Sequence, residues 1–233
     1  ENIMATKKMI LDLDTGVDDA LALAYAIADP NIDLIGVVAS YGNNLLEQTA
    51  KNSLQLLELL GQDVPVFKGL SHSSTTDHFT VMQVSKEIHG NNGIGDISLP
   101  EPRHQVQTKD GVDFIIEAAH QYSKDLIVVP TGPLTNLAAA LHRDPQISRL
   151  IGNVTLMGGA LTVEGNVSEV AEANINQDAE AANEVFTSQL PITMVGLDVT
   201  LRTLLTKKET QQWRNLGTPA GIAYAELTDF YID

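Results

Sequence analysis

The sequence contains no cysteine, which excludes disulfide bonds, thiolate nucleophiles and any cysteine-ligated zinc or iron–sulfur site. This lack is typical of a reducing compartment and, with an N-terminal segment that has no signal-peptide core, favours a cytoplasmic location. Met4 is expected to be the native start, after vector-derived residues. Apolar runs are also short, and none approaches the roughly 20 residues that span a bilayer.

Basic side chains are scarce as well. There are 14 Lys and Arg against 30 Asp and Glu, so the formal net charge is −16. Proteins that bind nucleic-acid backbones or anionic membranes generally present a basic surface. We therefore expect neither nucleic acid nor a membrane as a partner. Hydrophobic residues make up 43% of the 233 residues, which is enough to bury one sizeable core.

Strand-like and helix-like segments alternate along the chain. Short apolar runs typical of buried parallel strands alternate with segments of helical period. We expect strands at 9–11, 32–39, 64–67, 126–129, 154–157 and 192–195, and helices at 20–26, 45–60, 112–122, 133–143 and from 206 onward. The alternation, without repeats or linkers, predicts one α/β domain over residues 1–233. Its sheet should be open, mostly parallel and doubly wound (Rossmann-like), with helices on both faces.

Two segments depart from this alternation. Residues 69–107 are polar and rich in Gly, and so long a loop is usually functional or mobile. We expect either a flap over the strand ends or a poorly ordered insertion. At the other end of the chain, a helix should direct its apolar side chains towards a packing partner that is missing from the sequence: Tyr224, Leu227, Phe230 and Tyr231.

Four carboxylates lie within the eight residues Asp12–Asp19, between a strand and a helix. Asp12 and Asp14 are two apart on a strand and share a face, whereas Asp18 and Asp19 fall in the first helical turn. Helix capping explains one or two such residues, but four repel one another unless a cation or donors compensate them. Oxygen ligands suit magnesium or calcium. An aspartyl-phosphatase, with Asp12 as nucleophile and magnesium as its metal, is an alternative.

Several ordered motifs resemble the inosine–uridine-preferring nucleoside hydrolase family. Asp12–Ala20 is similar to the aspartate signature of that family, and further motifs follow at fitting separations: His89–Gly93, Val129–Asn136, Leu156–Gly159 and Val170–Asn174. The resemblance covers nearly the whole chain. It implies an α/β hydrolase that cleaves the N-glycosidic bond of ribonucleosides to ribose and free base through a calcium-activated water.

The resemblance also implies a single Ca²⁺ ion and two catalytic residues. Asp14 and Asp19 would be carboxylate ligands, and Thr131 would contribute its backbone carbonyl oxygen. Asp14 would accept the proton of the attacking water, and His89 would lie near the leaving base.

The ribose would be held by a set of polar side chains and one apolar contact. Amides and carboxylates suit vicinal hydroxyls because they orient and discriminate them. The resemblance implies Asp18 and Asn43 at the 2′- and 3′-hydroxyls, Asn166, Glu172 and Asn174 on the 3′ and 5′ side, and Met157 against the apolar edge of the sugar.

The chain departs from the family at its end. It stops at Asp233 and contains no His-Asp dipeptide, the late family pair that supplies a further calcium ligand and a histidine for the leaving group. We therefore expect a C-terminally truncated copy. The resemblance implies a cytoplasmic homodimer or homotetramer in nucleoside salvage, and a ribose-binding remnant without chemistry stays open as an alternative.

Overall fold

The computed structural model describes residues 6–233, so the expected start at Met4 lies outside the described residues. Its centre is a six-stranded parallel sheet in the order β3-β2-β1-β4-β5-β6. The strands are β1 (Lys7–Leu13), β2 (Ile32–Ala39), β3 (Val66–Lys68), β4 (Leu126–Pro130), β5 (Asn153–Met157) and β6 (Ile192–Val195). The expected open, doubly wound sheet is confirmed.

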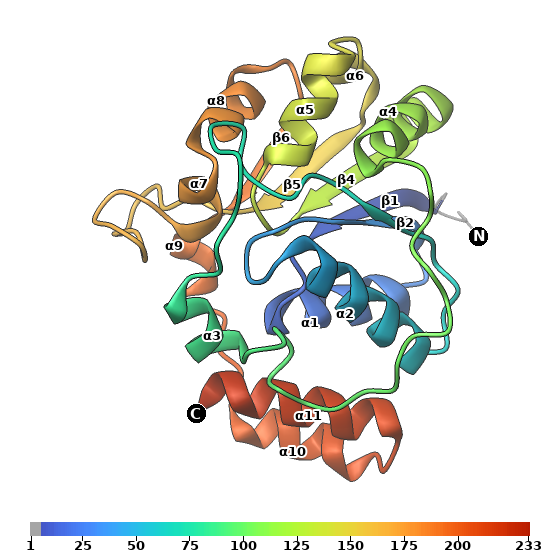
Figure 1. Cartoon of the computed structure of the whole chain (residues 1–233), viewed down its shortest axis with the longest axis vertical. Helices are drawn as coiled ribbons and strands as arrows, with labels where there is room; N and C mark the ends of the chain where they lie inside the picture. Colours follow the sequence, from blue (N-terminus) through green and yellow to red (C-terminus); the bar gives the residue numbers. More distant parts are fainter. Residues whose placement is uncertain (1–5) are drawn as a thin grey trace, which may run out of the picture.

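Helices connect the strands and cover the sheet on both sides (Figure 1). They are α1 (Val17–Ala28), α2 (Leu46–Leu59), α3 (Gln83–His89), α4 (Gly111–Tyr122), α5 (Thr135–Arg143), α6 (Ile147–Leu150), α7 (Ala173–Gln177), α8 (Ala179–Thr187), α9 (Leu197–Thr200), α10 (Lys207–Asn215) and α11 (Pro219–Ile232). Each expected helix is present. Their bounds differ from the expected ones by up to a few residues; Pro133, for example, lies two residues before α5 and not in its first turn.

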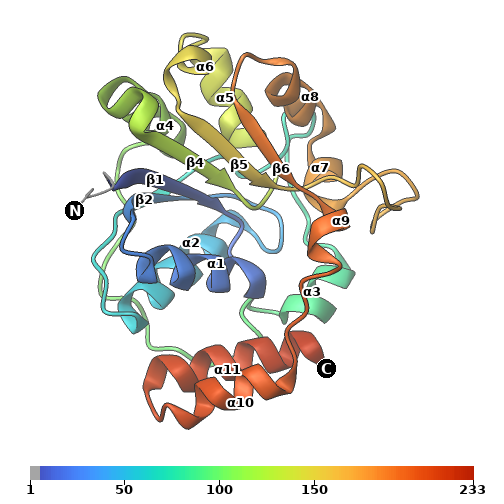
Figure 2. The ribbon, with the colours of Figure 1, turned by 180° about the vertical axis from the view of Figure 1, so that it is seen from behind.

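The two faces of the sheet bury alternate side chains of the same strands. Ile10 and Val128 pack on the side of α4, α5, α6 and α8, whereas Leu11 and Val37 pack on the side of α1 and α2. This alternation follows from the two-residue period of a strand. Figure 2 shows the same two layers from behind, with α10 and α11 lying outside α1 and α2.

The strand order reverses direction at the carboxyl ends of β1 and β4. From β1 the chain proceeds to β2 and β3 on one side, and β4 returns to pair with β1 on the other. Asp12 pairs in register with Pro130, and the N–H of Thr131 donates to the Asp12 carbonyl oxygen at 2.9 Å. In open α/β sheets, ligands bind at such a reversal of strand order. The aspartate cluster therefore lies where this fold binds ligands.

Two expectations need correction. Residues 69–107 are not irregular throughout, because they contain α3, and α2 side chains hold their backbone: Gln55 donates to the carbonyl oxygens of Leu99 and Pro100. In α11, Tyr224 and Leu227 are buried within the chain itself, and the Tyr224 hydroxyl donates to the Ala20 carbonyl oxygen at 2.8 Å. The apolar side of α11 therefore packs on α1, so these two residues do not await a missing partner.

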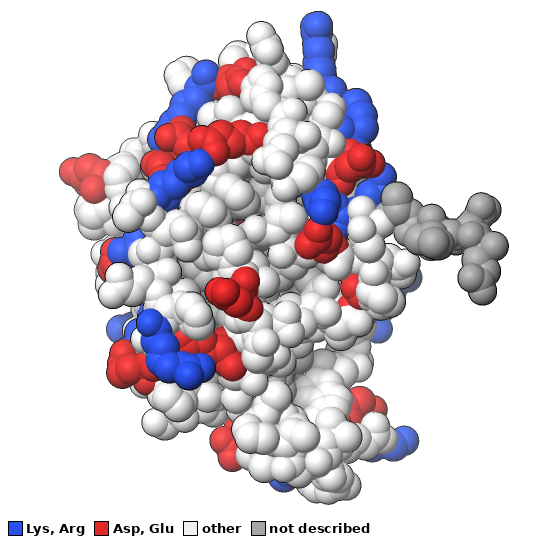
Figure 3. Space-filling model, turned by 90° about the vertical axis from the view of Figure 1, so that its right-hand side faces the viewer, with Lys and Arg blue, Asp and Glu red and all other residues white. Residues whose placement is uncertain are grey.

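Charged side chains are interspersed on the face drawn in Figure 3, where Lys and Arg lie among Asp and Glu. Several are paired, as in the Arg143–Asp113 contact at 2.9 Å. Across residues 6–233, none of the helices combines the length and apolar character that crossing a membrane requires.

Candidate active site

The aspartates of the Asp12–Asp19 segment occupy different environments. Asp14 is fully buried, and its Oδ2 atom accepts a hydrogen bond from the main-chain N–H of Asn43 at 2.8 Å. Asp19 is also fully buried, in the first turn of α1, where the helix dipole favours a negative charge. The Asp18 side chain is 52% exposed. A deep carboxylate pair thus lies beside a carboxylate that a ligand can reach.

Burial governs the protonation of these carboxyl groups. It raises the pKa of Asp14 well above its usual range, and the charges of Asp19 and Asp18 raise it further. Burial and the Asp18 charge raise the pKa of Asp19 to about 7, against the opposing effect of hydrogen bonds from Thr131 and its other donors. The cluster therefore favours a proton or a cation that offsets its charge.

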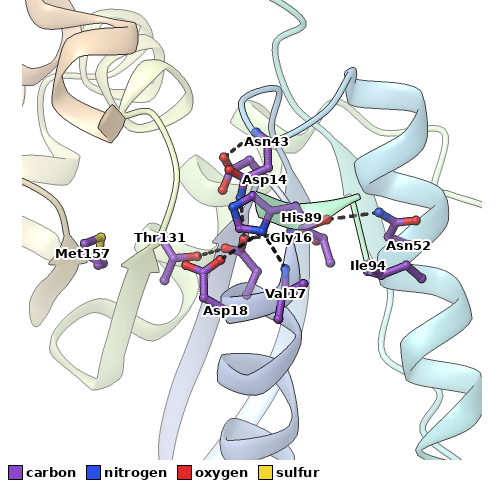
Figure 4. Close-up of polar contacts among 12 residues, drawn as sticks. Asp14, Gly16, Val17, Asp18, Asn43, Asn52, His89, Ile94, Thr131 and Met157 are labelled. Carbon is purple, nitrogen blue, oxygen red and sulfur yellow. Dashed lines mark hydrogen bonds and ion pairs between the residues drawn. The ribbon is translucent and has the colours of Figure 1, made fainter. Parts of the chain in front are cut away.

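Hydrogen bonds join the loops after β1, β2, β4 and β5. The Asn43 side chain donates to Asp19 Oδ2 at 3.1 Å, and the Thr131 hydroxyl donates to Asp19 Oδ1. The Asn174 amide donates to the carbonyl oxygens of Thr131 at 2.8 Å and Met157 at 3.0 Å. Figure 4 shows the hydrogen bond between Asn43 and Asp14, with Thr131 directed at a carboxylate of α1 from the other side of the first turn of that helix. Residues far apart in the sequence therefore form one connected polar site.

Glu172 holds the far side of this network in place. It is 2% exposed and caps α7, with Oε1 accepting from the Asn174 N–H at 2.9 Å. Its Oε2 atom accepts from the N–H of Gly159 at 3.0 Å and of Ile175 at 3.1 Å. The capping explains why Asn174 points at Thr131. The expected contact of Glu172 with a sugar stays a prediction.

His89 reaches the site from the C-terminal end of α3. Its Nδ1 atom accepts a hydrogen bond from the Val17 N–H at 3.1 Å and lies 3.9 Å from Asp18 Oδ1. Burial lowers the pKa of His89, and the Asp18 charge opposes that shift. Because Nδ1 accepts, the neutral ring carries its proton on Nε2. His89 is thus a neutral donor beside the aspartates (Figure 4).

Asn166 lies apart from this network. It is exposed in the loop between β5 and α7, and its Oδ1 atom accepts from the Ala173 N–H at 2.9 Å. The other expected residues are linked by hydrogen bonds or short contacts around the strand ends. The structure thus gives Asn166 a role in ordering the start of α7, and its sugar contact stays a prediction.

Comparison with known proteins identifies the family. A family model described as "Inosine-uridine preferring nucleoside hydrolase" matches residues 9–233. The chain belongs to this nucleoside hydrolase family. The finding confirms the expected resemblance and decides against the aspartyl-phosphatase alternative.

Individual members of the nucleoside hydrolase family align over most of the chain. "Probable uridine nucleosidase 2" of Arabidopsis thaliana is 36% identical over 228 residues, which are 97% of this chain and 70% of that protein. The structure of a purine-preferring ribonucleoside hydrolase from Gardnerella vaginalis has 56% identity and a TM-score of 0.96, with 97% of this chain and 72% of that one covered. A plant nucleoside hydrolase structure has 33% identity and a TM-score of 0.91, with coverages of 97% and 70%.

Sequence reasoning gave Asp12 a role only in the aspartyl-phosphatase alternative and gave Asn136 none, although both lie in family motifs. In this family member Asp12 is 1% exposed, and its Oδ1 atom accepts from the Asn136 amide at 3.0 Å. Burial raises the pKa of Asp12 to about 7, against the effect of that hydrogen bond. The spacing Asp12-x-Asp14 was the signal that could have pointed to it. Asn136 could not be paired with it, because 124 residues separate the two.

The oxygen atoms of the candidate site are suitable ligands for a hard cation. Asp14 Oδ1 is buried and accepts no hydrogen bond from residues 6–233, although Asp14 Oδ2 does. No three His, Asp or Glu side chains converge as a metal-binding group within the described part of the chain. A calcium ion would therefore need the Thr131 carbonyl oxygen and water in addition to Asp14 and Asp19, which is an ordinary ligand set for that ion.

Proposed function

We propose that the chain hydrolyses the N-glycosidic bond of ribonucleosides to ribose and free base, with Asp14 as the general base. The observation that carries this proposal is the buried Asp14 carboxylate, whose Oδ1 atom has no hydrogen-bond donor within residues 6–233. Burial raises the pKa of Asp14, which makes its carboxylate a stronger base than an exposed one. The family match over residues 9–233 supports the reaction class.

The ribose-binding groups follow from the polar network. Asp18 is exposed enough to accept hydrogen bonds from a vicinal diol, and Asn43 lies on the same side of the site. Asn174 and Glu172, which are hydrogen-bonded to each other, would bind the 3′ and 5′ side of the ribose, with Met157 against its apolar edge. Contacts that strengthen as the sugar ring flattens favour the oxocarbenium-like transition state.

Calcium is part of the proposal. Asp14, Asp19 and the Thr131 carbonyl oxygen would hold it, and the ion would make a bound water more acidic. Asp14 would take the proton of the attacking water. The neutral His89, with its proton on Nε2, would lie near the leaving base.

We further propose that purine ribonucleosides are the preferred substrates. The Gardnerella vaginalis structure, with 56% identity, is described as purine-preferring, whereas the 36% identical Arabidopsis thaliana relative is described as a uridine nucleosidase. A cytoplasmic location, a role in nucleoside salvage and assembly into a homodimer or homotetramer also belong to this proposal. Light scattering after size-exclusion chromatography would measure the assembly.

The test is the release of reducing sugar from inosine, uridine and cytidine, with added calcium or with a chelator. We expect ribose release that needs calcium, is fastest with inosine and is abolished in Asp14→Ala. Calorimetry with inosine on the same samples separates catalysis from binding alone. Binding of inosine without ribose release would overturn the proposed hydrolysis, and an unchanged rate in Asp14→Ala would overturn the role of this residue.

A further inference from the structure

One buried side chain of α2 connects two loops of the candidate site. Asn52 is fully buried, and its amide nitrogen donates to the carbonyl oxygens of Thr15 at 3.1 Å and of Asn92 at 2.8 Å. Its Oδ1 atom accepts from the Gln48 side chain at 2.8 Å. Both N–H groups and the oxygen of this amide are therefore used, which fixes the orientation of the side chain. Figure 4 shows Asn52 pointing from α2 towards the turn after β1.

The backbone is shaped to admit this amide. Gly93 follows Asn92 and has a φ of +84°, in the region that favours glycine. A Cβ atom at residue 93 would lie 3.1 Å from the Asn52 amide nitrogen and 3.4 Å from the Thr15 carbonyl oxygen. Glycine at position 93 thus gives Asn52 room to reach both carbonyl groups.

The two carbonyl groups belong to the segments that carry the reacting groups. Thr15 directly follows Asp14, and Asn92 lies three residues after His89. The Asn44 amide donates to the neighbouring Asn91 carbonyl oxygen at 2.9 Å, and His89 Nδ1 accepts from the Val17 N–H. Asn52 therefore touches the backbone of both segments at once.

We infer that Asn52 is a positioning residue for hydrolysis, because its amide holds the loop of His89 in register with the turn of Asp14. This inference rests on the proposed function. Within residues 6–233, the hydrogen bonds of the Asn52 side chain go to backbone carbonyl groups and to Gln48, so it acts through other groups. The expected ribose-binding residues Asn43 and Asn174 have partners of their own. Loss of Asn52 should therefore lower kcat more than it raises KM.

A matched control lies one turn further along α2. Gln55 is also buried, and its amide nitrogen also donates to two carbonyl oxygens, those of Leu99 at 3.2 Å and Pro100 at 2.8 Å. Those residues carry none of the expected catalytic groups. Asn52→Ala and Gln55→Ala therefore each remove a side-chain amide of α2 that binds two carbonyl oxygens, but only the amide of Asn52 binds segments of the candidate site.

The experiment compares inosine hydrolysis and hydrogen–deuterium exchange in the full chain and these two variants. In Asn52→Ala we expect kcat to fall at least about 10-fold with a small change in KM, because misplacing a catalytic group by a fraction of an ångström has effects of this size. We also expect faster exchange in residues 14–19 and 89–96. In Gln55→Ala we expect faster exchange near residues 99–100 and an unchanged kcat.

Two further variants keep the test decisive. Asn52→Asp keeps the volume of the side chain but replaces the donating amide nitrogen with an accepting oxygen, so it should show the same loss of kcat. It serves as the test if Asn52→Ala does not fold. A double-mutant cycle with His89→Ala tests whether Asn52 acts through His89. If it does, replacing Asn52 should lower kcat only slightly once the imidazole is absent.

The outcomes separate the two proposals. If the unaltered chain releases no ribose from any nucleoside, the proposed function fails. If the unaltered chain is active and Asn52→Ala keeps its kcat, or if Gln55→Ala lowers kcat as much, the positioning role of Asn52 is wrong while the proposed function stands. Full additivity of the Asn52 and His89 variants would likewise contradict the inference.

Discussion

The carboxylate of Asp14 packs against the backbone of Gly42, where a Cβ atom would come within 2.9 Å of Asp14 Cγ. Gly42 has a φ of +150° and precedes Asn43, whose N–H donates to Asp14 Oδ2. A side chain at residue 42 would therefore push the proposed base from its position and break the hydrogen bond that orients it. Glycine at this position is a requirement of the site as well as of the turn.

Gly42→Ala should lower kcat/KM for inosine by about 100-fold, because a displacement of about 1 Å at a reacting group has an effect of that order. Steady-state kinetics would measure it. The control is Gly61→Ala, which places a side chain at a φ of +67° with no atom within 4 Å of the new Cβ. That variant should lose about 1 kcal/mol of stability and keep its activity. Equal activities of the two variants would contradict the prediction.

Calcium should stabilise the chain through Asp14. A ligand that binds only the folded state raises the free energy of unfolding by about 2.7 kcal/mol at 100 times its Kd. Asp14→Asn should lose this response, and without calcium it should be at least as stable as the unaltered chain, since it removes a buried charge. Urea unfolding with calcium or a chelator would measure both effects. Asp125→Asn, which changes an exposed side chain 69% accessible to solvent, should respond to calcium as the unaltered chain does.

The stability of the chain should fall at mildly acidic pH because of His89. Burial lowers the pKa of His89 in the folded state, while Asp18 opposes the shift and the Tyr231 ring packs against it. The unfolded imidazole titrates at about 6.5, so the contribution of His89 is complete above that pH and is lost as the pH falls through the lower folded pKa.

The measurement is the free energy of unfolding at pH 7.5 and at pH 5.5, conditions chosen about one unit on either side of the unfolded pKa. The unaltered chain should lose more stability between them than His89→Gln does. His78→Gln changes a side chain that is 79% exposed and should follow the unaltered chain. Parallel behaviour of all three proteins would show that His89 is not held neutral by the fold.

The C-terminal helix should depend on a single buried hydroxyl. Tyr224→Phe removes the hydrogen bond to the Ala20 carbonyl oxygen and should reduce the free energy of unfolding by about 1 kcal/mol. Tyr25→Phe, at a side chain 70% exposed, is the matched control and should change stability little. Equal stabilities of the two variants would indicate that α11 does not dock on α1 as described.

Much of the fold was predictable because its signals are local. Strands buried on both faces are continuous apolar runs, such as Leu126–Val129, and amphipathic helices such as α2 repeat at 3.6 residues. The capping box of Thr206 and Glu209, which opens α10, is another signal that depends on residues close together in the chain. The helix α3 was missed because it is short and buries only Ser85 and His89, which leaves too little periodicity to recognise.

The candidate site was also predictable only where its signals are local. The sequence by itself determined the aspartate cluster, the ordered family motifs and the alternation of strands and helices, because each depends on residues close together in the chain. Only the tertiary structure decided that Asn174 meets Thr131, that Asn52 joins two loops, and that Asp12, Asp14 and Asp19 are buried with raised pKa values. Burial and hydrogen bonding between residues tens of positions apart are properties of the packed sheet, and no local pattern encodes them.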